Sequence, residues 1–257
     1  MLQQLGNSPF PVFMLLNTLD NAEYDALPKP QQQRLIGSVQ PNNHSVGKRL
    51  TEDLIALFQQ KASRAPLTLY ALQGDYTTPA SLARQQGMLS ALANVPSIRV
   101  IDSTVVNWSR HQAYTKALGL IQRQAIDVVW AANDPMAFGA KQALQELSQQ
   151  GTTLIGGINW DAQDSQFPLD VSYGGHVTLG ALAMVMLHDF HHALAEKDHM
   201  HQVVDIFERG TPTHIAAFNQ LLTDNHLENV DFRQFSKASP APRPFTIDNI
   251  LGTGKQQ

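Results

Sequence analysis

The sequence predicts an α/β fold built on a parallel sheet. Between Leu67 and Ile158, short apolar runs of strand length alternate with longer stretches of helical periodicity. Turn-forming residues separate the two kinds of segment. Strict alternation of this kind is typical of βαβ units, whose right-handed crossovers bring the loops that follow the strands to one edge of the sheet.

The expected strands are short, mostly apolar runs bounded by turn residues. In order, they are Pro11–Asn17, Leu35–Val39, Leu67–Gly74, Ile98–Ile101, Val128–Trp130, Thr152–Ile158, Val171–Tyr173 and Gln202–Phe207. The polar segment Ala22–Gln33 is rich in Pro and Gln, which favours a loop.

The expected helices carry apolar residues at helical spacing and begin after Asn, Ser, Asp or Gly. The first is expected after Asn43. The others are expected from about Ala80 to Ala93, from Ser109 to Gln122, from Pro135 onward, and, as a long apolar helix, from Gly175 to about Ala195. The tail, residues 236–257, is rich in Pro and Ser with little periodicity, which favours a surface path or partial disorder.

The centre of the prediction is the stretch Asp127–Ala140. The apolar run Val128–Trp130 leads into Asn133-Asp134-Pro135. Asp134 is expected to cap the next helix, and Pro135 suits its first turn because the missing N–H would have no partner there. Asn133 is therefore expected at the carboxyl edge of the sheet, where open α/β sheets bind ligands.

Composition excludes several classes. Hydrophobic residues make up 43% of the 257 residues, which is typical of a globular protein. The net charge is −4 without a basic patch, so nucleic acid is not an expected partner. The absence of cysteine excludes disulfides and thiolate chemistry. The first ten residues lack the pattern of a signal peptide, and no run approaches the ~20 apolar residues of a membrane span.

Two motifs carry a resemblance. The residues ANDPMAFGAKQAL, Ala132–Leu144, match a pattern that resembles type I periplasmic solute-binding proteins of the ribose-binding kind, whose fold the effector domains of LacI-type regulators share. The segment DFRQFSK, Asp231–Lys237, is similar to the tails of some ABC-transporter solute-binding proteins. The resemblance implies two Rossmann-like parallel-sheet lobes.

The resemblance also divides the chain. Residues 1–41 and 174–205 would form part of the first lobe, residues 42–173 and 206–235 the second lobe, and residues 236–257 the C-terminal tail. The family begins with three more βα units before the strand at Pro11, on the order of 75–90 residues, and with a signal peptide. The first lobe is thus expected to be incomplete. An unpaired Pro11 strand would then predict dimerisation or instability.

The resemblance implies a non-enzymatic receptor that binds a small polar ligand, sugar-like or polyol, between two closing lobes. It would act in the periplasm and deliver the ligand to the membrane permease of an ABC importer. Two alternatives stay open: a sensor subunit for a membrane kinase or chemoreceptor, and the effector domain of a LacI-type regulator. A signal peptide or a helix-turn-helix encoded upstream would separate receptor from regulator.

Five residues are candidates for ligand contact when the family's site is carried over. Asn133 falls on the family's ligand-binding Asn, Trp108 on the aromatic that stacks on the ligand, and Asn159 where Asp is common. Arg84 falls near an Arg that reaches ligand in some members, and Asn17 at the end of a first-lobe strand. Each also has a structural reading, such as turn residue, core aromatic or surface helix residue.

The departures from the family pattern indicate a nearly neutral, amide-rich site. Leu16 stands where sugar binders often have Asp, Leu82 where ribose-type binders have Arg, and Asn159 in place of a carboxylate. Each change removes a charged, directional contact. A neutral polyol, another sugar or a small polar metabolite is therefore expected rather than ribose.

No enzyme is expected, because the sequence lacks GxGxxG, P-loop and GxSxG motifs and pairs no nucleophile with a base. No cofactor is implied. His188 and His192 form an i, i+4 pair that could hold a metal, but no HExxH pattern accompanies them. A solvated helix end, where His is favoured, is the preferred interpretation.

Overall fold

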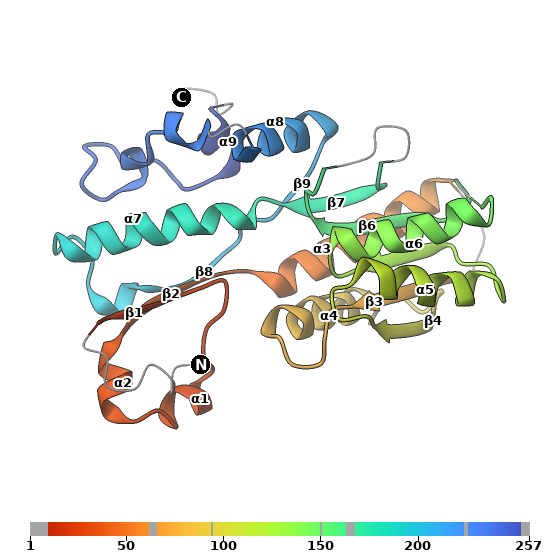
Figure 1. Ribbon diagram of the computed structural model, residues 1–257, viewed down its shortest axis with the longest axis horizontal. Helices are drawn as coiled ribbons and strands as arrows, with labels where there is room; N and C mark the ends of the chain where they lie inside the picture. Colours follow the sequence, from red (N-terminus) through yellow and green to blue (C-terminus); the bar gives the residue numbers. More distant parts are fainter. Residues whose placement is uncertain are drawn as a thin grey trace. The chain divides into compact units, whose positions relative to one another are not determined.

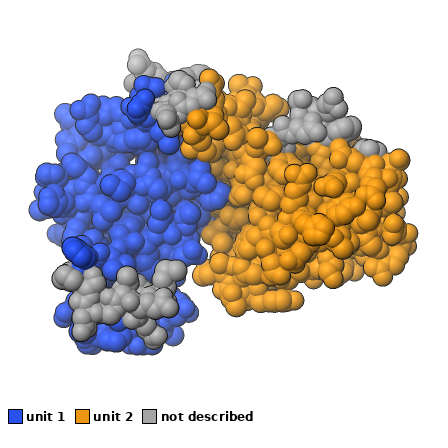
Figure 2. Space-filling view, viewed as in Figure 1, with its two compact units in different colours: residues 1–42, 176–206, 224–257 blue, residues 43–175, 207–223 orange. Residues whose placement is uncertain are grey.

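The computed structural model describes residues 10–61, 66–93, 95–149, 151–162, 168–223 and 226–252 (Figure 1). The chain forms two compact units (Figure 2): unit 1 takes the described residues of 1–42, 176–206 and 224–257, and unit 2 those of 43–175 and 207–223. The chain crosses between the units after residues 42, 175 and 206. Residues 226–235, expected in the second lobe, belong to unit 1.

Unit 1 contains a parallel sheet in the order β1-β2-β8. These strands are β1 (Val12–Leu15), β2 (Leu35–Pro41) and β8 (His201–Val204). After a short 3-10 turn, helix α7 (Leu179–His191) packs against β1 and β2. Within the described residues, β1 pairs with β2 alone.

The polar segment after β1 is helical, which corrects the expectation of a loop. It contains α1 (Asn21–Asp25) and α2 (Lys29–Arg34). Asp20 begins α1 with a capping box. Its carboxylate accepts from the Glu23 N–H at 2.7 Å, and the Glu23 carboxylate accepts from the Asp20 N–H at 2.9 Å. These helices depend on caps and local polar bonds, so apolar periodicity does not reveal them.

The C-terminal segment is described from residue 226 to residue 252, and its part beyond residue 236, for which a surface path or partial disorder was expected, includes a helix. It contains the 3-10 turns η4 (His226–Asn229) and η5 (Phe232–Phe235) and the helix α9 (Ile247–Leu251). Ile247 and Ile250 are buried. The last helix therefore contributes to the core of unit 1.

Unit 2 is built on a sheet in the order β4-β3-β5-β6-β7-β9. All neighbours are parallel except β7 and β9. Its strands are β3 (Leu67–Gln73), β4 (Ile98–Val105), β5 (Val128–Ala131), β6 (Leu154–Asn159), β7 (Val171–Gly174) and β9 (Glu208–Arg209). The chain proceeds from β3 to β4 on one side and then returns to β5 on the other. The topological switch point therefore lies between β3 and β5, where such sheets bind ligands.

Two pairs of helices accompany this sheet: α3 (Asn43–Lys61) packs on α4 (Pro79–Leu92), and α5 (Arg110–Ile121) packs on α6 (Asp134–Glu146) (Figure 1). A further helix, α8 (Pro212–Thr223), follows β9. Helices α3 and α4 meet backbone to backbone, since a Cβ on Gly47 would lie 2.1 Å from the Arg84 carbonyl oxygen. This contact fixes the position of Arg84 along α4.

The core of unit 2 lies around the central strands, and all four residues of β5 are buried. Trp130, Tyr70 and Leu72 are among its largest fully buried side chains. The predicted α/β architecture with parallel sheets is confirmed. In the part of the chain that the structure describes, no helix combines the length and the apolar character needed to span a bilayer.

Candidate ligand-binding site

Asn133 stands where β5 ends and α6 begins, as the sequence predicts. It is the N-cap of α6, and its Oδ1 accepts the Met136 N–H at 2.9 Å. The side chain is 8% exposed. Its Nδ2 has no hydrogen-bond partner among the described residues. Asn133 thus serves as a structural cap through its oxygen while it keeps an unused donor on its nitrogen.

Asp134 was expected to cap this helix, and that expectation is wrong. It is the first residue of α6 and is completely buried. Its carboxylate accepts from the Ser172 hydroxyl at 2.8 Å and from the Asp161 N–H at 3.0 Å. Burial raises the pKa of Asp134 to about 7, although the hydrogen bond from Ser172 acts in the opposite direction. Asp134 therefore ties α6 to the ends of β6 and β7.

Arg84 is buried rather than on the helix surface, with 5% of its area exposed. Its Nε donates to Asn43 Oδ1 at 2.9 Å and its Nη1 to the Ala132 carbonyl at 2.6 Å. The second terminal nitrogen, Nη2, has no hydrogen-bond partner in the described part of the chain. Burial lowers the pKa of Arg84 to about 10, and the charge of Asp134 opposes this shift. The guanidinium remains protonated near neutral pH.

Trp108 lies in the loop between β4 and α5 with a left-handed backbone, φ 59°. Its Nε1 donates to Asp75 Oδ2 at 2.7 Å, and its ring lies against Gly74, where a Cβ would come within 2.2 Å of it. The Arg84 guanidinium carbon is 5.8 Å from the ring centroid. Only a residue without a side chain at position 74 leaves room for this ring.

Asp75 orients Trp108 from the loop that follows β3. Its carboxylate also accepts the backbone N–H groups of Thr77 and Thr78, at 2.8 and 2.6 Å, and the Thr78 hydroxyl. Burial acts to raise the pKa of Asp75, but hydrogen bonds from Thr78, Thr77 and Trp108 outweigh it and hold that pKa below its usual range. Asp75 is thus a fixed anion at the end of β3.

Three of the predicted residues therefore meet at the switch point. Asn133 follows β5, Arg84 binds the carbonyl next to Asn133, and Trp108 lies beside Arg84. Asn159 ends β6, and its Nδ2 lies 3.4 Å from Asp161 Oδ2. Asn17 is exposed in unit 1, two residues after β1.

The sequence reasoning missed three residues that hold this cluster: Asn43, Asp75 and Phe207. Asn43 and Asp75 make the hydrogen bonds described above, and the Phe207 ring lies 5.5 Å from the Arg84 guanidinium carbon. Asp75 directly follows the Leu67–Gly74 run, so the strand-end rule that selected Asn133 would also have found it. No motif in the neighbouring sequence marks Phe207. It reaches Arg84 only because the chain enters unit 2 at residues 206–207.

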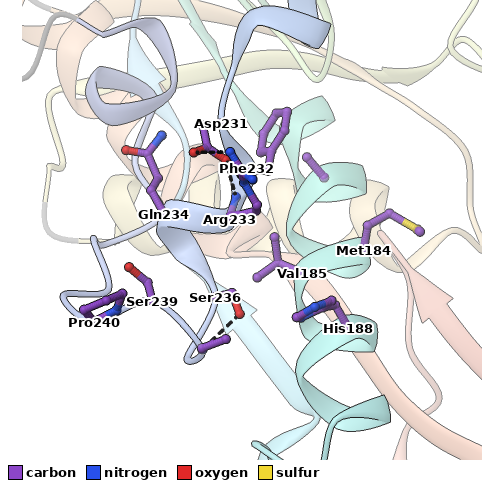
Figure 3. Close-up of a pocket in the computed structure, with 12 residues that line it drawn as sticks. Met184, Val185, His188, Asp231, Phe232, Arg233, Gln234, Ser236, Ser239 and Pro240 are labelled. Carbon is purple, nitrogen blue, oxygen red and sulfur yellow. Dashed lines mark hydrogen bonds and ion pairs between the residues drawn. The ribbon is translucent and has the colours of Figure 1, made fainter.

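A cavity of about 800 Å³ lies within unit 1, between α7 and the C-terminal segment 231–240 (Figure 3). Its walls include Met184, Val185 and Phe232. The charged side chains at its rim, Asp231 and Arg233, pair with each other through two contacts of 2.7 and 3.1 Å. None of the predicted site residues lines this cavity. Most of its exposed wall area is apolar, although half of the residues that line it carry polar or charged side chains.

The histidines of α7 are close to one another, with 4.5 Å between the ring centroids of His188 and His192. Among the described residues, no group of three or more His, Asp or Glu side chains is arranged to hold a metal ion. His188 lies 3.3 Å from the buried Asp189, which the C-terminal segment covers through Ser236 and Lys237. These contacts give His188 a place in the packing of unit 1.

Residues 18–167, more than half of the chain, match the model of the periplasmic binding protein domain. The chain is 30% identical over 124 residues to the xylitol-binding protein of Mycolicibacterium smegmatis, covering 48% of this chain and 34% of that protein. It is 24% identical over 149 residues to the galactofuranose-binding protein YtfQ of Escherichia coli, covering 56% and 43%.

Among solved structures, a periplasmic sugar-binding protein from Pseudomonas fluorescens is similar with a TM-score of 0.84 and 27% identity. That likeness covers 97% of this chain and 76% of the other. The chain spans less than half the length of the two curated relatives named above. The family match, the strand order of unit 2 and the polar cluster at its switch point agree, and the chain belongs to the periplasmic binding protein family.

Proposed function

We propose that this chain binds a small neutral polyhydroxy ligand, a sugar or a polyol, at the carboxyl edge of the unit 2 sheet. It would do so without catalysis, as the solute receptor of an ABC importer in the periplasm. The observation that carries the proposal is the cluster of Asn133, Arg84 and Trp108 at the switch point between β3 and β5.

The chemistry of these side chains suits a polyhydroxy ligand. The Trp108 ring is held in place by Asp75 and can cover the apolar C–H face of a sugar. Asn133 Nδ2 and Arg84 Nη2 are donors without partners among the described residues, and ligand hydroxyl oxygens can accept from them. Leaving such donors unpaired in a closed site would be costly, so a ligand with matching oxygens is favoured over an apolar one.

The charges present favour a neutral ligand. The two charged groups beside Trp108 are Arg84 and Asp75, and both are engaged by groups of unit 2 itself. Leu82, on α4, is apolar and 40% exposed. A ligand ammonium would therefore find the Asp75 carboxylate already occupied by donors, while Arg84 offers a hydroxyl oxygen one N–H group through Nη2.

The relatives support the same ligand class. The two curated relatives are a xylitol-binding and a galactofuranose-binding protein, and the P. fluorescens structure is a periplasmic sugar-binding protein. Delivery to a permease and closure of the two lobes over the ligand are part of this proposal, because the family resemblance implies them. Contacts from Asn159 and Asn17 stay predictions.

A thermal-shift screen tests the proposal with xylitol, myo-inositol, D-allose, D-fructose and L-arabinose. A compound that binds only the folded state should stabilise it by about 2.7 kcal/mol at a hundredfold excess over its Kd. We expect at least one compound to raise the Tm, and NMR of the mixture should recover that compound unchanged. Asn133→Ala should abolish the shift.

The matched control is Ser236→Ala in unit 1, which should retain the shift. The proposal fails if none of these compounds raises the Tm of the wild-type chain. It also fails if charged metabolites such as amino acids raise the Tm instead. Conversion of the compound to a product would overturn the non-enzymatic assignment.

A further inference from the structure

Arg84 contacts segments of unit 2 that are remote in sequence and that include two chain crossings. We propose that Arg84 is a positioning residue that couples the ligand-binding edge of unit 2 to the points where the chain enters this unit. The coupling itself is a property of the chain's own contacts. Its use in ligand response rests on the function proposed above.

One side of the guanidinium holds the binding edge. Nη1 donates to the Ala132 carbonyl at 2.6 Å, one residue before Asn133. Asn133 in turn accepts the Met136 N–H through its side chain and the Ala137 N–H through its carbonyl, at 2.9 and 3.2 Å. A shift of the Ala132 peptide therefore changes the cap of α6 and the direction of the Asn133 side chain together.

The other side of the guanidinium holds the crossings. Nε donates to Asn43, which is the first residue of unit 2 after the crossing at residues 42–43. The guanidinium carbon lies 5.5 Å from the ring centroid of Phe207, the first residue after the crossing at residues 206–207. One buried side chain thus contacts both points at which the chain enters unit 2.

A second arginine extends the connection to the crossing at residues 175–176. Arg49 Nη1 donates to the Phe207 carbonyl at 2.9 Å, and its guanidinium carbon lies 4.9 Å from the Tyr173 ring centroid. The Tyr173 hydroxyl donates to Asp53 Oδ2 at 2.7 Å. Tyr173 stands two residues before Gly175, the last residue of unit 2 before that crossing.

The position suits arginine alone among the cations. The planar guanidinium serves two acceptors in fixed directions while its face packs on rings, which a lysine ammonium cannot do. The backbone of Arg84 cannot retreat, because α4 meets α3 at Gly47. A displacement at the crossings must therefore either move the Ala132 peptide or break a hydrogen bond of Arg84.

The test is hydrogen exchange followed by mass spectrometry on the whole chain without any ligand. Asn43→Ala removes the acceptor of the Arg84 Nε bond at the crossing and changes no residue between Ala132 and Ala137. Arg84→Lys removes the planar group that serves both Asn43 and the Ala132 carbonyl. Both variants should raise the exchange of the Met136 and Ala137 amides by about tenfold. The control is Thr51→Ala, which removes the buried hydroxyl bond to the Gly47 carbonyl within α3 and should leave these amides unchanged.

A second arm adds xylitol or D-allose at saturating concentration to the wild type and to Asn43→Ala. We expect wild-type protection at residues 133–137 and at residues 43 and 207, and protection confined to residues 133–137 in the variant. The inference is overturned if Asn43→Ala leaves the amides of α6 unchanged, or if Thr51→Ala loosens them equally. Lack of any protection in the wild type would instead contradict the proposed ligands, and the arm without ligand would still decide on the coupling.

Discussion

The switch-point cluster of unit 2 and the cavity of unit 1 would offer a ligand different surroundings. The cluster joins Asn133, Arg84 and Trp108, whose polar atoms are fixed by backbone and carboxylate partners. The cavity has a volume of about 800 Å³ and mostly apolar walls, and its rim charges satisfy each other.

For a polar ligand, fixed polar donors are on physical grounds a better indication of a binding site than empty space is. A ligand with many hydroxyls gains little from an apolar wall, because each hydroxyl that loses water must find a new partner. The cluster supplies donors with set directions beside a fixed aromatic ring. The cavity lies between α7 and the C-terminal segment 231–240, where these two parts of unit 1 pack on each other.

The largest expected effect comes from removing the charge at the centre of the cluster. Arg84→Met leaves Asn43 Oδ1 and the Ala132 carbonyl without their donor in a buried place. We expect unit 2 to lose about 4 kcal/mol of unfolding free energy, measured by urea denaturation, since each orphaned acceptor costs about 2 kcal/mol.

Arg99→Met is the matched control for this variant, since Arg99 is an exposed arginine of β4. It should change the stability by less than about 0.5 kcal/mol. Equal losses in the two variants would contradict the structural role assigned to Arg84.

A pH series sharpens the comparison through Asp134. Its pKa in the folded chain is raised to about 7, against about 3.9 in an unfolded chain. The folded state thus binds more protons than the unfolded state between these values, so this group's contribution to stability is present below about pH 4 and is lost as the pH rises to about 7. Asp134→Asn should flatten this fall, measured as Tm against pH. A parallel fall in Asp134→Asn and wild type would refute the assignment.

Gly74→Ala tests whether Trp108 needs the space beside β3. The new Cβ would lie 2.2 Å from the indole, so the ring must leave Asp75. We expect the free energy of unfolding to fall by about 2 kcal/mol, the Trp fluorescence to shift to the red and sugar binding to weaken.

Gly119→Ala is the control, because its Cβ would meet only Arg123 Nη2 at 3.9 Å. This variant should stabilise α5 by about 0.5 kcal/mol. Unchanged fluorescence in Gly74→Ala would show that the ring is not held there.

The smallest effect is expected in unit 1. Ser236→Ala removes the hydroxyl that donates to Asp189 and should cost about 1.5 kcal/mol, measured by urea denaturation. Sugar affinity should stay within twofold of the wild-type value. A large loss of affinity would indicate that the C-terminal segment 231–240 of unit 1, rather than the carboxyl edge of the unit 2 sheet, controls binding.

The fold of unit 2 follows from the sequence because its signals are local. Apolar runs such as Val128–Trp130 alternate with segments whose apolar residues recur at helical spacing, and Pro135 marks the start of α6. Helix α1 escaped prediction because a capping box rather than an apolar face specifies it, and α2 because it is held by side-chain bonds of Gln32 and Arg34 to nearby carbonyls. Local reasoning could not tell Asn133 from Asp134 as the cap, because the partners of Asp134 are distant in sequence: Ser172 in β7 and Asp161 in the loop after β6.

The site was predictable where strand ends supply residues and not where packing does. Asn133 follows from the switch-point rule. The burial of Arg84 depends on how α4 lies on α3 at Gly47 and on Phe207, which is distant in sequence. Helical periodicity places Arg84 on a face of α4 but does not say what covers that face.

The most direct test of the central claim is isothermal titration calorimetry with the sugar or polyol that gives the largest thermal shift. It compares the wild-type chain with Trp108→Ala in the cluster and Val185→Phe in the cavity of unit 1. We predict that Trp108→Ala weakens binding at least tenfold, or about 1.4 kcal/mol, and that Val185→Phe binds like the wild type. Loss of binding in Val185→Phe with normal affinity in Trp108→Ala would contradict the account and place the ligand in the apolar cavity.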